Sequence, residues 1–561
     1  MKTIYLSFIA MLGACTMLSA QTGRQPIPAG GFLQTIRASQ SETHNDARTP
    51  SAPTVQYGND IIIQNAPAID QRRVRISVAF NGWVYAAYST YDSAGVAGGI
   101  TIRSSRDNGM TWTTVDSYSP QNIVYPAFDI VVCGTDTNNL TLYLAGVNHN
   151  TTSGNYVLFV DRYNATTGSF IGSNYNLQNG TRRIYDVALA SDYRFPAVGA
   201  SPYSVGLLYS AYSSSVDSMV FLGSVDGGGT WSVRQSVMTT GYYFRNVSLA
   251  YGRSASASNG RYFGAWEMLT SSGDRTGHIY TSRSTSTVND AWIPPVNLDS
   301  ISSSMINLCC NPEIAVQFNG TDNDSSSVTA VVLCQRDFYG NGTDYDLLGF
   351  YNKRAHYTNF WNRLDIVNSG ENDLQPDISY DPGYDNFLTV YYDSTDGKLP
   401  YCVNGNNLVA PNTWNYITPQ YNDMTGNLRA AWPRVEINPM LTQTAHAWIA
   451  EGAGSNGVAM FDAEYLTSSI SEAGGASITG LFPNPSSSSF TLNYSTSDNN
   501  AVLFTVTNTL GEVVETRRPD GSGPGNHTEQ FDVSGWANGV YFVTMLNNGK
   551  SSTARIVVAH P

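Results

Sequence analysis

The feature that most constrains the fold is a pair of strand-like segments that recurs about every 60 residues between positions 56 and 470. In each unit, an alternating segment that begins near a Pro or an Arg is followed by a turn and an aromatic-rich segment. The first segments are Val74–Val78, Pro126–Ile130, Arg183–Val187, Arg245–Leu249, Pro312–Val316, Pro376–Tyr380 and Pro433–Ile437. The second segments are Val84–Tyr88, Thr141–Ala145, Gly206–Ala211, Tyr262–Trp266, Val328–Leu333, Phe387–Tyr391 and Ala445–Ile449.

These units predict an all-β fold, a β-propeller spanning residues 56–470. One such unit cannot bury both of its faces, whereas a ring of units can. Seven units can be aligned, which favours seven blades, with six or eight as the alternatives. The last unit lacks a strand after Val458–Tyr465, and we expect Asp60–Gln64 to supply it and close the ring. The composition agrees, because 50 Gly and 35 Tyr with only 13% charged residues suit short strands and polar turns.

A second, smaller unit is expected at residues 478–561, after a linker rich in Gly, Ala and Ser at residues 471–477. Turn residues such as Asn547-Asn548-Gly549 separate its short alternating runs. This pattern is typical of a small β-sandwich of about 80 residues. The runs are Phe490–Tyr494, Val502–Thr507, Glu529–Val533, Val540–Leu546 and Ala554–Val558.

The N-terminus has the layout of a cleaved signal peptide at residues 1–20. Met1-Lys2 gives a short positive start, an apolar run follows, and Leu18-Ser19-Ala20 precedes the expected cut. The alternative is a lipobox ending at Cys15, which would then be acylated. Residues 21–55 are polar and without period, as expected of a tether or a trimmed leader. The rest of the chain contains no apolar run of about 20 residues, so we expect no transmembrane helix.

The charge balance limits the partners. The formal net charge is −14 and the isoelectric point is near 4.9. Nucleic acid and anionic membranes attract proteins of the opposite sign, so neither is an expected partner. The acidity also suits an exported protein that stays in solution, and we expect a monomer.

The cysteine pattern predicts one disulfide and no zinc site. Without Cys15 five cysteines remain, an odd count without metal-ligand spacing. A hairpin centred on Asp322 would place Cys310 opposite Cys334, at a separation that a disulfide can bridge. The pairing of Cys133, Cys309 and Cys402 stays open.

Calcium is the only cofactor that the sequence suggests. Asp322-Asn323-Asp324 and Asp344-Tyr345-Asp346 offer oxygen ligands of the kind that hold Ca²⁺. The alternative is that these segments are acidic loop tips that interact only with solvent. We identify no other metal or cofactor site from the sequence.

Two octapeptides fit the pattern S-x-D-x-G-x-T-W and resemble the Asp-box (BNR repeat) of sialidase-like propellers. In such a turn Asp accepts backbone N–H bonds, Gly takes a positive φ and Trp packs beneath the sheet. The resemblance implies a structural role, away from any active site. The matching residues are Ser105, Asp107, Gly109, Thr111 and Trp112 in one turn, and Ser224, Asp226, Gly228, Thr230 and Trp231 in the other.

The last 80 or so residues resemble the C-terminal sorting domain of the type IX secretion system, the Por secretion tail of Bacteroidetes-like bacteria. The resemblance implies contact with the type IX secretion machinery and export through the outer membrane. The protein would then be released or stay on the cell surface. The matching segments are Phe482-Pro483-Asn484-Pro485, Asn508-Thr509-Leu510-Gly511-Glu512, Asn538-Gly539-Val540-Tyr541 and Arg555-Ile556-Val557-Val558.

The sialidase resemblance also implies a candidate site. In that family three Arg bind the substrate carboxylate, a Tyr paired with a Glu is the nucleophile, and an Asp is the acid and base. Arg75-Ile76-Ser77 stands where the first Arg is expected, although Ser77 replaces the family's Pro. A Tyr–Glu pair cannot be assigned by motif. The residues expected at the propeller mouth are Arg75, Arg245, Glu313, Asp377, Tyr380 and Arg434.

These observations favour a non-catalytic recognition propeller for an extracellular glycan or protein. A propeller mouth is a rigid concave platform that can bind a ligand without moving. The first alternative is a glycoside hydrolase of the sialidase type, with Arg75, Arg245 and Arg434 as anion binders. The second is a structural or adhesive surface protein whose flanks make the contacts. Arginines that pair with Glu313 or Asp377 would favour a structural role for these side chains.

Overall fold

A computed structural model describes most of the chain after residue 59. The residues described are 60–66, 69–91, 98–134, 140–192, 204–213, 216–253, 260–285, 291–301, 308–318, 328–367, 372–382, 386–394, 401–405, 415–417, 429–438, 444–451, 456–463, 477–496, 502–508, 513–519, 525–547 and 550–560. The predicted signal peptide, the lipobox alternative and the leader lie outside these residues. The same holds for most of the expected linker and for the side chain of Cys402.

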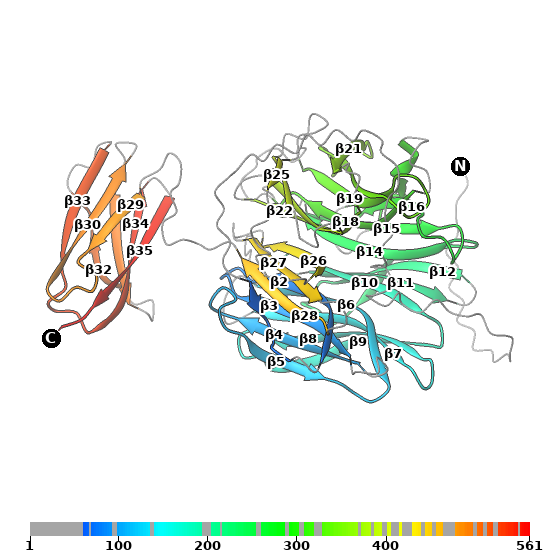
Figure 1. Cartoon of the computed structure of the whole chain (residues 1–561), viewed down its shortest axis with the longest axis horizontal. Coiled ribbons are helices and arrows are strands. Elements are labelled where there is room, and N and C mark those ends of the chain that lie inside the picture. Colours follow the sequence, from blue (N-terminus) through cyan, green and yellow to red (C-terminus); the bar gives the residue numbers. More distant parts are fainter. Residues whose placement is uncertain are drawn as a thin grey trace.

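Residues 61–463 form seven four-stranded antiparallel sheets, and the fold is all-β as expected (Figure 1). The first sheet contains β2 (Asp70–Val78), β3 (Val84–Tyr91), β4 (Gly98–Ser105) and β5 (Thr113–Tyr118). The second contains β6 (Ile123–Cys133), β7 (Thr141–Asn150), β8 (Tyr156–Asn164) and β9 (Phe170–Gly180). The third contains β10 (Ile184–Ser191), β11 (Val205–Ser213), β12 (Val216–Ser224) and β13 (Ser232–Thr239).

The remaining sheets repeat this order. The fourth contains β14 (Tyr243–Gly252), β15 (Arg261–Leu269), β16 (His278–Arg283) and β17 (Val296–Asn297), followed by the 3-10 turn η3 (Asp299–Ile301). The fifth contains β18 (Cys309–Val316), β19 (Ala330–Asp337), β20 (Tyr345–Asn352) and β21 (Asn362–Val367). The sixth contains β22 (Asp373–Asp381), β23 (Asn386–Asp393), β24 (Tyr401–Gly405) and β25 (Asn415–Ile417). The seventh contains β26 (Arg429–Ile437), β27 (Thr444–Glu451), β28 (Val458–Ala463) and β1 (Ile61–Ile62).

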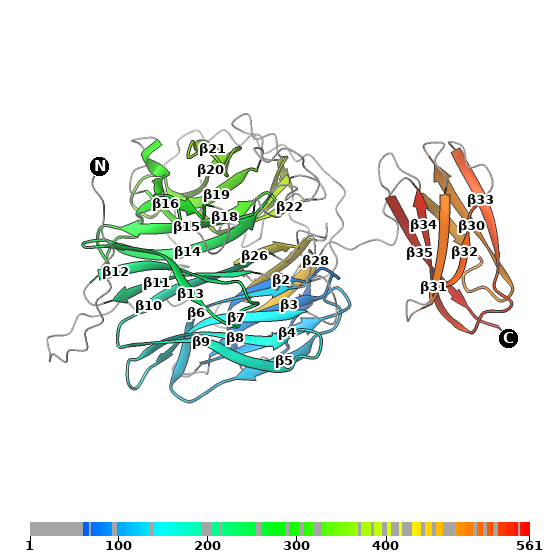
Figure 2. The ribbon, with the colours of Figure 1, turned by 180° about the vertical axis from the view of Figure 1, so that it is seen from behind.

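The first strands of the sheets contact one another in a closed ring, in the order β2, β6, β10, β14, β18, β22, β26 and back to β2. Figure 2 shows the fourth strands β5 and β9 along the outer edge of the same body. Separate hydrophobic clusters fill the spaces between neighbouring sheets, so each sheet buries both of its faces against others. This arrangement is the β-propeller that the repeat predicted.

The ring closes where the sequence indicated. Strand β1 pairs with β28, with Ile61 opposite Phe461. Ile63 is buried in a cluster shared with β2, β3, β27 and β28, and the Ala459 N–H donates to the side-chain oxygen of Gln71 at 2.8 Å. Figure 1 accordingly shows the yellow strands β26–β28 beside the blue strands β2 and β3. The segment that begins the propeller therefore completes its last sheet.

The C-terminal strands form a two-layer sandwich. One layer is β29 (Ser477–Phe482), β30 (Ser489–Thr496) and β33 (Gly525–Asp532). The other is β32 (Val513–Arg517), β31 (Val502–Asn508), β34 (Gly539–Asn547) and β35 (Lys550–Val558). Inward side chains such as Phe490, Phe504, Phe531 and Val543 are completely buried between the layers.

The two S-x-D-x-G-x-T-W segments fold into matching turns between the third and fourth strands of their sheets. Asp226 accepts hydrogen bonds from the Ser224 hydroxyl at 2.8 Å and from the Thr230 N–H at 2.9 Å. Asp107 makes the same two contacts with Ser105 and Thr111, each at 2.8 Å. Trp112 packs edge-on against Phe461 of the preceding sheet, with ring centroids 5.2 Å apart.

The predicted Cys310–Cys334 disulfide is wrong. A β-bulge between Cys310 and Glu313 shifts the hairpin, so that Cys310 lies opposite Gln335. Neighbouring residues of a strand point to opposite faces, and Cys334 therefore points away from Cys310. Cys334 packs with Cys309 in the core shared by the fourth and fifth sheets, whereas Cys310 packs towards the sixth and seventh. The described cysteines 133, 309, 310 and 334 are buried thiols.

The described segment considered for calcium, Asp344–Asp346, is not an exposed loop tip. Asp344 and Asp346 are 4% and 3% exposed, at the start of β20, and Asp322–Asp324 lies outside the described residues. The described residues contain no group of three or more His, Cys, Asp or Glu arranged to hold a metal ion. Calcium binding stays a prediction. Across the described part of the chain, no helix has the length and hydrophobicity needed to cross a membrane.

Candidate binding site at the propeller axis

A cavity of about 180 Å³ lies on the propeller axis and is lined by the first strands of all seven sheets. Five of the six residues that the sequence assigned to the mouth line this cavity, and Arg245 does not. Asp129 and Glu436 line it as well. The five expected residues are Arg75, Glu313, Asp377, Tyr380 and Arg434.

A β-bulge in each first strand determines which side chains face the axis. Bulges interrupt the pairing of all seven first strands with their second strands. In β22, for example, Gln375 adopts a φ of 54° at the bulge, and Asp377 follows two residues later. Arg75 and Arg434 likewise follow positive-φ residues, Arg73 and Trp432. A bulge re-aims the strand beyond it, which turns these charged side chains towards the axis.

The charges at the axis are paired with one another. Nη1 of Arg434 lies 2.7 Å from a carboxylate oxygen of Glu313 and 3.2 Å from one of Asp377. Nε of Arg75 lies 3.5 Å from a carboxylate oxygen of Asp129. These five residues come from five different sheets, so the ion pairs hold sheets together across the axis.

The same carboxylates accept main-chain hydrogen bonds from the next sheet. Asp129 accepts the N–H of Leu189 at 2.8 Å, and Asp377 accepts the N–H of Val435 at 2.8 Å. Asp186 accepts the N–H of Val247 in the same way, at 3.1 Å. Each carboxylate therefore satisfies a backbone donor that would otherwise be left unpaired between two sheets.

Burial and neighbouring charges shift the ionisation of this group in opposite directions. Burial raises the pKa of Asp186 to about 6, although Arg75 and Arg73 oppose the shift. Burial and the nearby Glu313 raise the pKa of Asp377 to about 6, although Arg434 opposes this shift. Burial alone would lower the pKa of Arg434, but Glu313 and Asp377 outweigh it and raise that pKa. The Arg434 guanidinium therefore stays charged, while Asp186 and Asp377 titrate near pH 6.

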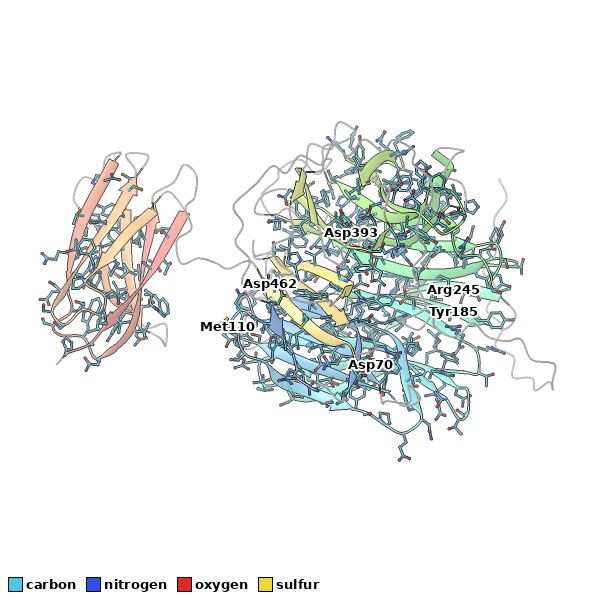
Figure 3. The ribbon with its side chains drawn as sticks, in the orientation of Figure 1. Asp70, Met110, Tyr185, Arg245, Asp393 and Asp462 are labelled. Carbon is cyan, nitrogen blue, oxygen red and sulfur yellow. The ribbon has the colours of Figure 1, made fainter. Side chains whose placement is uncertain are left out.

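Arg245 lies apart from the cavity because of its place relative to the bulge. It precedes the bulge of β14, whereas Arg75 and Arg434 follow theirs. Its Nη1 contacts a carboxylate oxygen of the buried Asp217 at 2.6 Å, and its guanidinium lies 3.4 Å from the ring centroid of Tyr185. Figure 3 shows Arg245 and Tyr185 side by side. The expected trio of Arg75, Arg245 and Arg434 is not brought together.

A second group of arginines lies near Tyr185, and we call Arg73, Arg183 and Arg245 the arginine rim. Arg183 and Arg245 lie against the Tyr185 ring, whereas the guanidinium of Arg73 lies 5.1 Å from the ring centroid of Trp432 and donates to the carbonyl of Pro126. The guanidinium of Arg183 lies 5.3 Å from the ring centroid of Tyr185. Burial lowers the pKa of Arg183, and Arg245 and Arg73 lower it further. Nearby, His149 stacks on Tyr156 with ring centroids 4.2 Å apart.

Sequence reasoning missed Asp129, Asp186, Arg73 and Arg183 as site residues. Their signal was present, because all four lie in or beside the recurring first segments. The residue alignment of those segments did not account for the bulges, which fall later in Arg183–Val187 and Arg245–Leu249 than in segments such as Pro376–Tyr380.

Comparisons with known proteins place the C-terminal unit in a family. Residues 480–559 match the sequence model of the secretion system C-terminal sorting domain (Por_Secre_tail). No curated protein matches the chain in sequence.

Among solved structures, a protein of unknown function from Dyadobacter fermentans has 11% identity and a TM-score of 0.43, covering 74% of this chain and 100% of its own. An alpha-L-arabinanase from Penicillium chrysogenum, complexed with arabinobiose, has 13% identity and a TM-score of 0.40, covering 72% and 98%. PorZ, a surface component of the type IX secretion system of Porphyromonas gingivalis, has 10% identity and a TM-score of 0.25, covering 87% and 82%. The match to the sorting-domain model identifies residues 480–559 as a type IX sorting domain, and the protein is exported by type IX secretion to the cell surface or the extracellular space.

Proposed function

We propose that the propeller is a non-catalytic recognition module that binds an extracellular glycan or protein. The observation that carries this proposal is the mutual pairing of the charges at the axis. Arg434 contacts both Glu313 and Asp377, and Arg75 lies beside Asp129. Arginines engaged in this way hold sheets together, which supports binding by a rigid scaffold over carboxylate capture by a catalytic site.

The end of the propeller where the first strands begin is the proposed binding face. In an antiparallel sheet the first strand begins where the hairpin between the second and third strands turns. That topology gathers Tyr185 and Arg245 with the β7–β8 and β11–β12 hairpins, which supply Tyr156 and Asp217. The half-buried aromatic and charged side chains there are already oriented by their neighbours, so a ligand would meet a pre-formed surface.

A glycoside hydrolase is the second candidate, favoured by the ionisation of the axial aspartates. A general acid works best when the pKa of its carboxyl group lies close to the working pH. The pKa values of Asp186 and Asp377 are raised from 3.8 to about 6, which brings them closer to this condition than an ordinary aspartate. In this alternative, Asp377 would donate the proton and a neighbouring carboxylate would act as base or nucleophile.

The test compares binding and turnover in the same protein, the chain from Gln21 onwards. A glycan array and a panel of fluorogenic glycosides, sialosides included, are applied in parallel. Saturable glycan binding without turnover would support the recognition module. Turnover that Asp377→Asn abolishes, in a variant with unchanged thermal unfolding, would establish the hydrolase instead.

If neither glycans nor glycosides respond, a pull-down with cell-envelope and extracellular proteins decides between the two remaining functions. A protein partner that binds at the propeller mouth would support the recognition role. A partner bound only through the outer strands would replace it with the adhesive role.

A further inference from the structure

We propose that the arginine rim binds an anionic group, a carboxylate or a sulfate, on an acidic glycan. This inference rests on the proposed recognition function and specifies its ligand. It is carried by the guanidiniums of Arg183 and Arg245, which both lie against Tyr185 at the end of the propeller where the first strands begin, and by Arg73, which lies near Arg183.

The geometry of the rim keeps like charges close together. The guanidiniums of Arg183 and Arg245 lie 5.3 and 3.4 Å from the ring centroid of Tyr185. Arg73 is near enough to act on both Arg183 and the carboxylate of Asp186. Because like charges in a partly buried site repel one another, an anion entering between them gains more than it would at isolated surface arginines.

The acidic groups around the rim are already used within the protein. Asp217, whose side chain is completely buried, pairs with Arg245 at 2.6 Å. Asp186 accepts the N–H of Val247 and lies towards the axis. Both carboxylates therefore have structural partners, while the planar guanidinium edges match the geometry of a carboxylate or sulfate.

The neighbours of the rim favour a sugar over an acidic peptide. His149 and Tyr156 form a stacked pair, and Tyr243 lies with its ring centroid 5.5 Å from the guanidinium of Arg245. Burial and the charge of Arg183 lower the pKa of His149, which keeps its imidazole neutral at pH 7. A neutral imidazole and tyrosine hydroxyls can both donate to and accept from sugar hydroxyls, and aromatic rings pack against sugar C–H faces.

The experiment measures binding of defined oligosaccharides to the chain from Gln21 onwards. The probes are an oligogalacturonate, its fully methyl-esterified form, a chondroitin sulfate oligosaccharide, a neutral galactose oligomer and a poly-glutamate peptide. We expect the oligogalacturonate, the sulfated oligosaccharide or both to bind. Affinity should fall as salt rises, and the methyl ester should bind at least tenfold more weakly than the free acid.

Arg183→Gln is the decisive variant, with Arg182→Gln as its matched control. Arg182 is the preceding residue and is exposed, so it tests for a general loss of surface charge. We expect Arg183→Gln to weaken binding on the order of 10- to 100-fold, because a hydrogen bond to a charged group is lost. Arg183→Lys should restore part of the affinity, and thermal unfolding of each variant checks that the fold is intact.

Three results would overturn the inference in distinguishable ways. Equal binding of the free acid and its methyl ester, unaffected by Arg183→Gln, would refute an anion site and leave glycan recognition standing. Binding of poly-glutamate alone, with the same dependence on Arg183, would replace the glycan with an acidic protein. Turnover of a glycoside, with no ligand of either kind retained, would refute the recognition function itself.

Discussion

At the residue scale, one hydrogen-bonding arrangement recurs between neighbouring sheets, with a neutral side chain in one copy and a titratable one in the other. Gln335 of β19 accepts the side-chain amide of Asn311 at 2.6 Å and the N–H of Gln375 in the next sheet at 3.0 Å. One sheet earlier, Glu267 of β15 accepts the side-chain amide of Asn246 at 2.6 Å and the N–H of Asn311. A buried glutamate therefore occupies a position where a glutamine suffices.

Glu267→Gln is expected to make the propeller more stable above pH 7. Burial raises the pKa of Glu267 from 4.5 to about 7 in the folded protein. Between these two values the unfolded chain is ionised while the folded chain holds the proton, so the wild type loses stability as pH rises through this range. The variant should lack that loss and gain roughly 2–3 kcal/mol at pH 8 relative to pH 4.5.

Urea unfolding of both proteins at pH 4.5 and pH 8 measures this difference. Gln335→Glu is the matched reverse variant, and it should acquire the same loss of stability with rising pH. A stability difference that is the same at both pH values would contradict the prediction.

The axial ion pairs lead to a second prediction at this scale. Arg434→Met leaves Glu313 and Asp377 without their shared cation, which should cost about 3 kcal/mol at pH 8. The cost should be smaller at pH 5, because Asp377, whose pKa is already raised to about 6, becomes neutral. Unfolding in guanidinium chloride at both pH values measures this cost, and Arg182→Met, at an exposed position, is the control. A larger cost at pH 5 than at pH 8 would show that charge repulsion is not the reason.

At the scale of elements, the turn between β12 and β13 joins its sheet to the preceding one. The carbonyl of Gly227 accepts hydrogen bonds from the Tyr143 hydroxyl at 2.7 Å and from the Arg162 guanidinium at 2.9 Å. Gly228 adopts a φ of +75°, and a methyl group there would lie 2.6 Å from Cε1 of Tyr143. The turn therefore needs its glycine both for its backbone conformation and for the close contact with β7.

Gly228→Ala and Gly241→Ala separate these two requirements. Gly241 also has a positive φ, +82°, but a methyl group there would meet no atom within 4 Å. We expect Gly241→Ala to cost about 1 kcal/mol for the backbone alone, and Gly228→Ala to cost about 3 kcal/mol because Tyr143 must also move. Denaturant unfolding of the two variants gives the comparison, and equal costs would refute the contact between the turn and β7.

At the scale of the whole molecule, the first described strand closes the ring. Asp70, labelled in Figure 3, accepts the N–H of Gly457 at 3.0 Å, and Ile63 donates to the carbonyl of Ala459 at 2.9 Å. These bonds join segments almost 400 residues apart, so they tie the last sheet to the first. Residues 61–63, which precede β2, are thus part of the propeller structure.

Two deletions test this closure. Removing residues 21–66 deletes β1 and the buried Ile63, and we expect the protein to lose about 3 kcal/mol of stability or more. Removing residues 21–55 leaves the closing strand in place and should change stability little. Thermal and urea unfolding of both deletions decide the point, and an equal loss in both would show that closure does not depend on β1.

The sequence alone was sufficient to predict the strands, the ring, its closing segment and the sorting domain. These features depend on local patterns: alternation within a strand, turn residues between strands, and a repeat whose single unit cannot bury its own faces. The segments Phe490–Tyr494 and Ala445–Ile449, for example, lie within β30 and β27. These local patterns do not depend on contacts between distant parts of the chain.

Only the tertiary structure decided which side chains meet at the axis and which cysteines lie together. A bulge adds one residue to a strand and moves every later side chain to the opposite face, and the sequence carries no clear mark of it. For this reason Arg245 lies away from Arg75 and Arg434, and Cys310 away from Cys334. Repetition and alternation are properties of neighbouring residues, whereas the position of a side chain at the axis depends on the summed geometry of seven sheets.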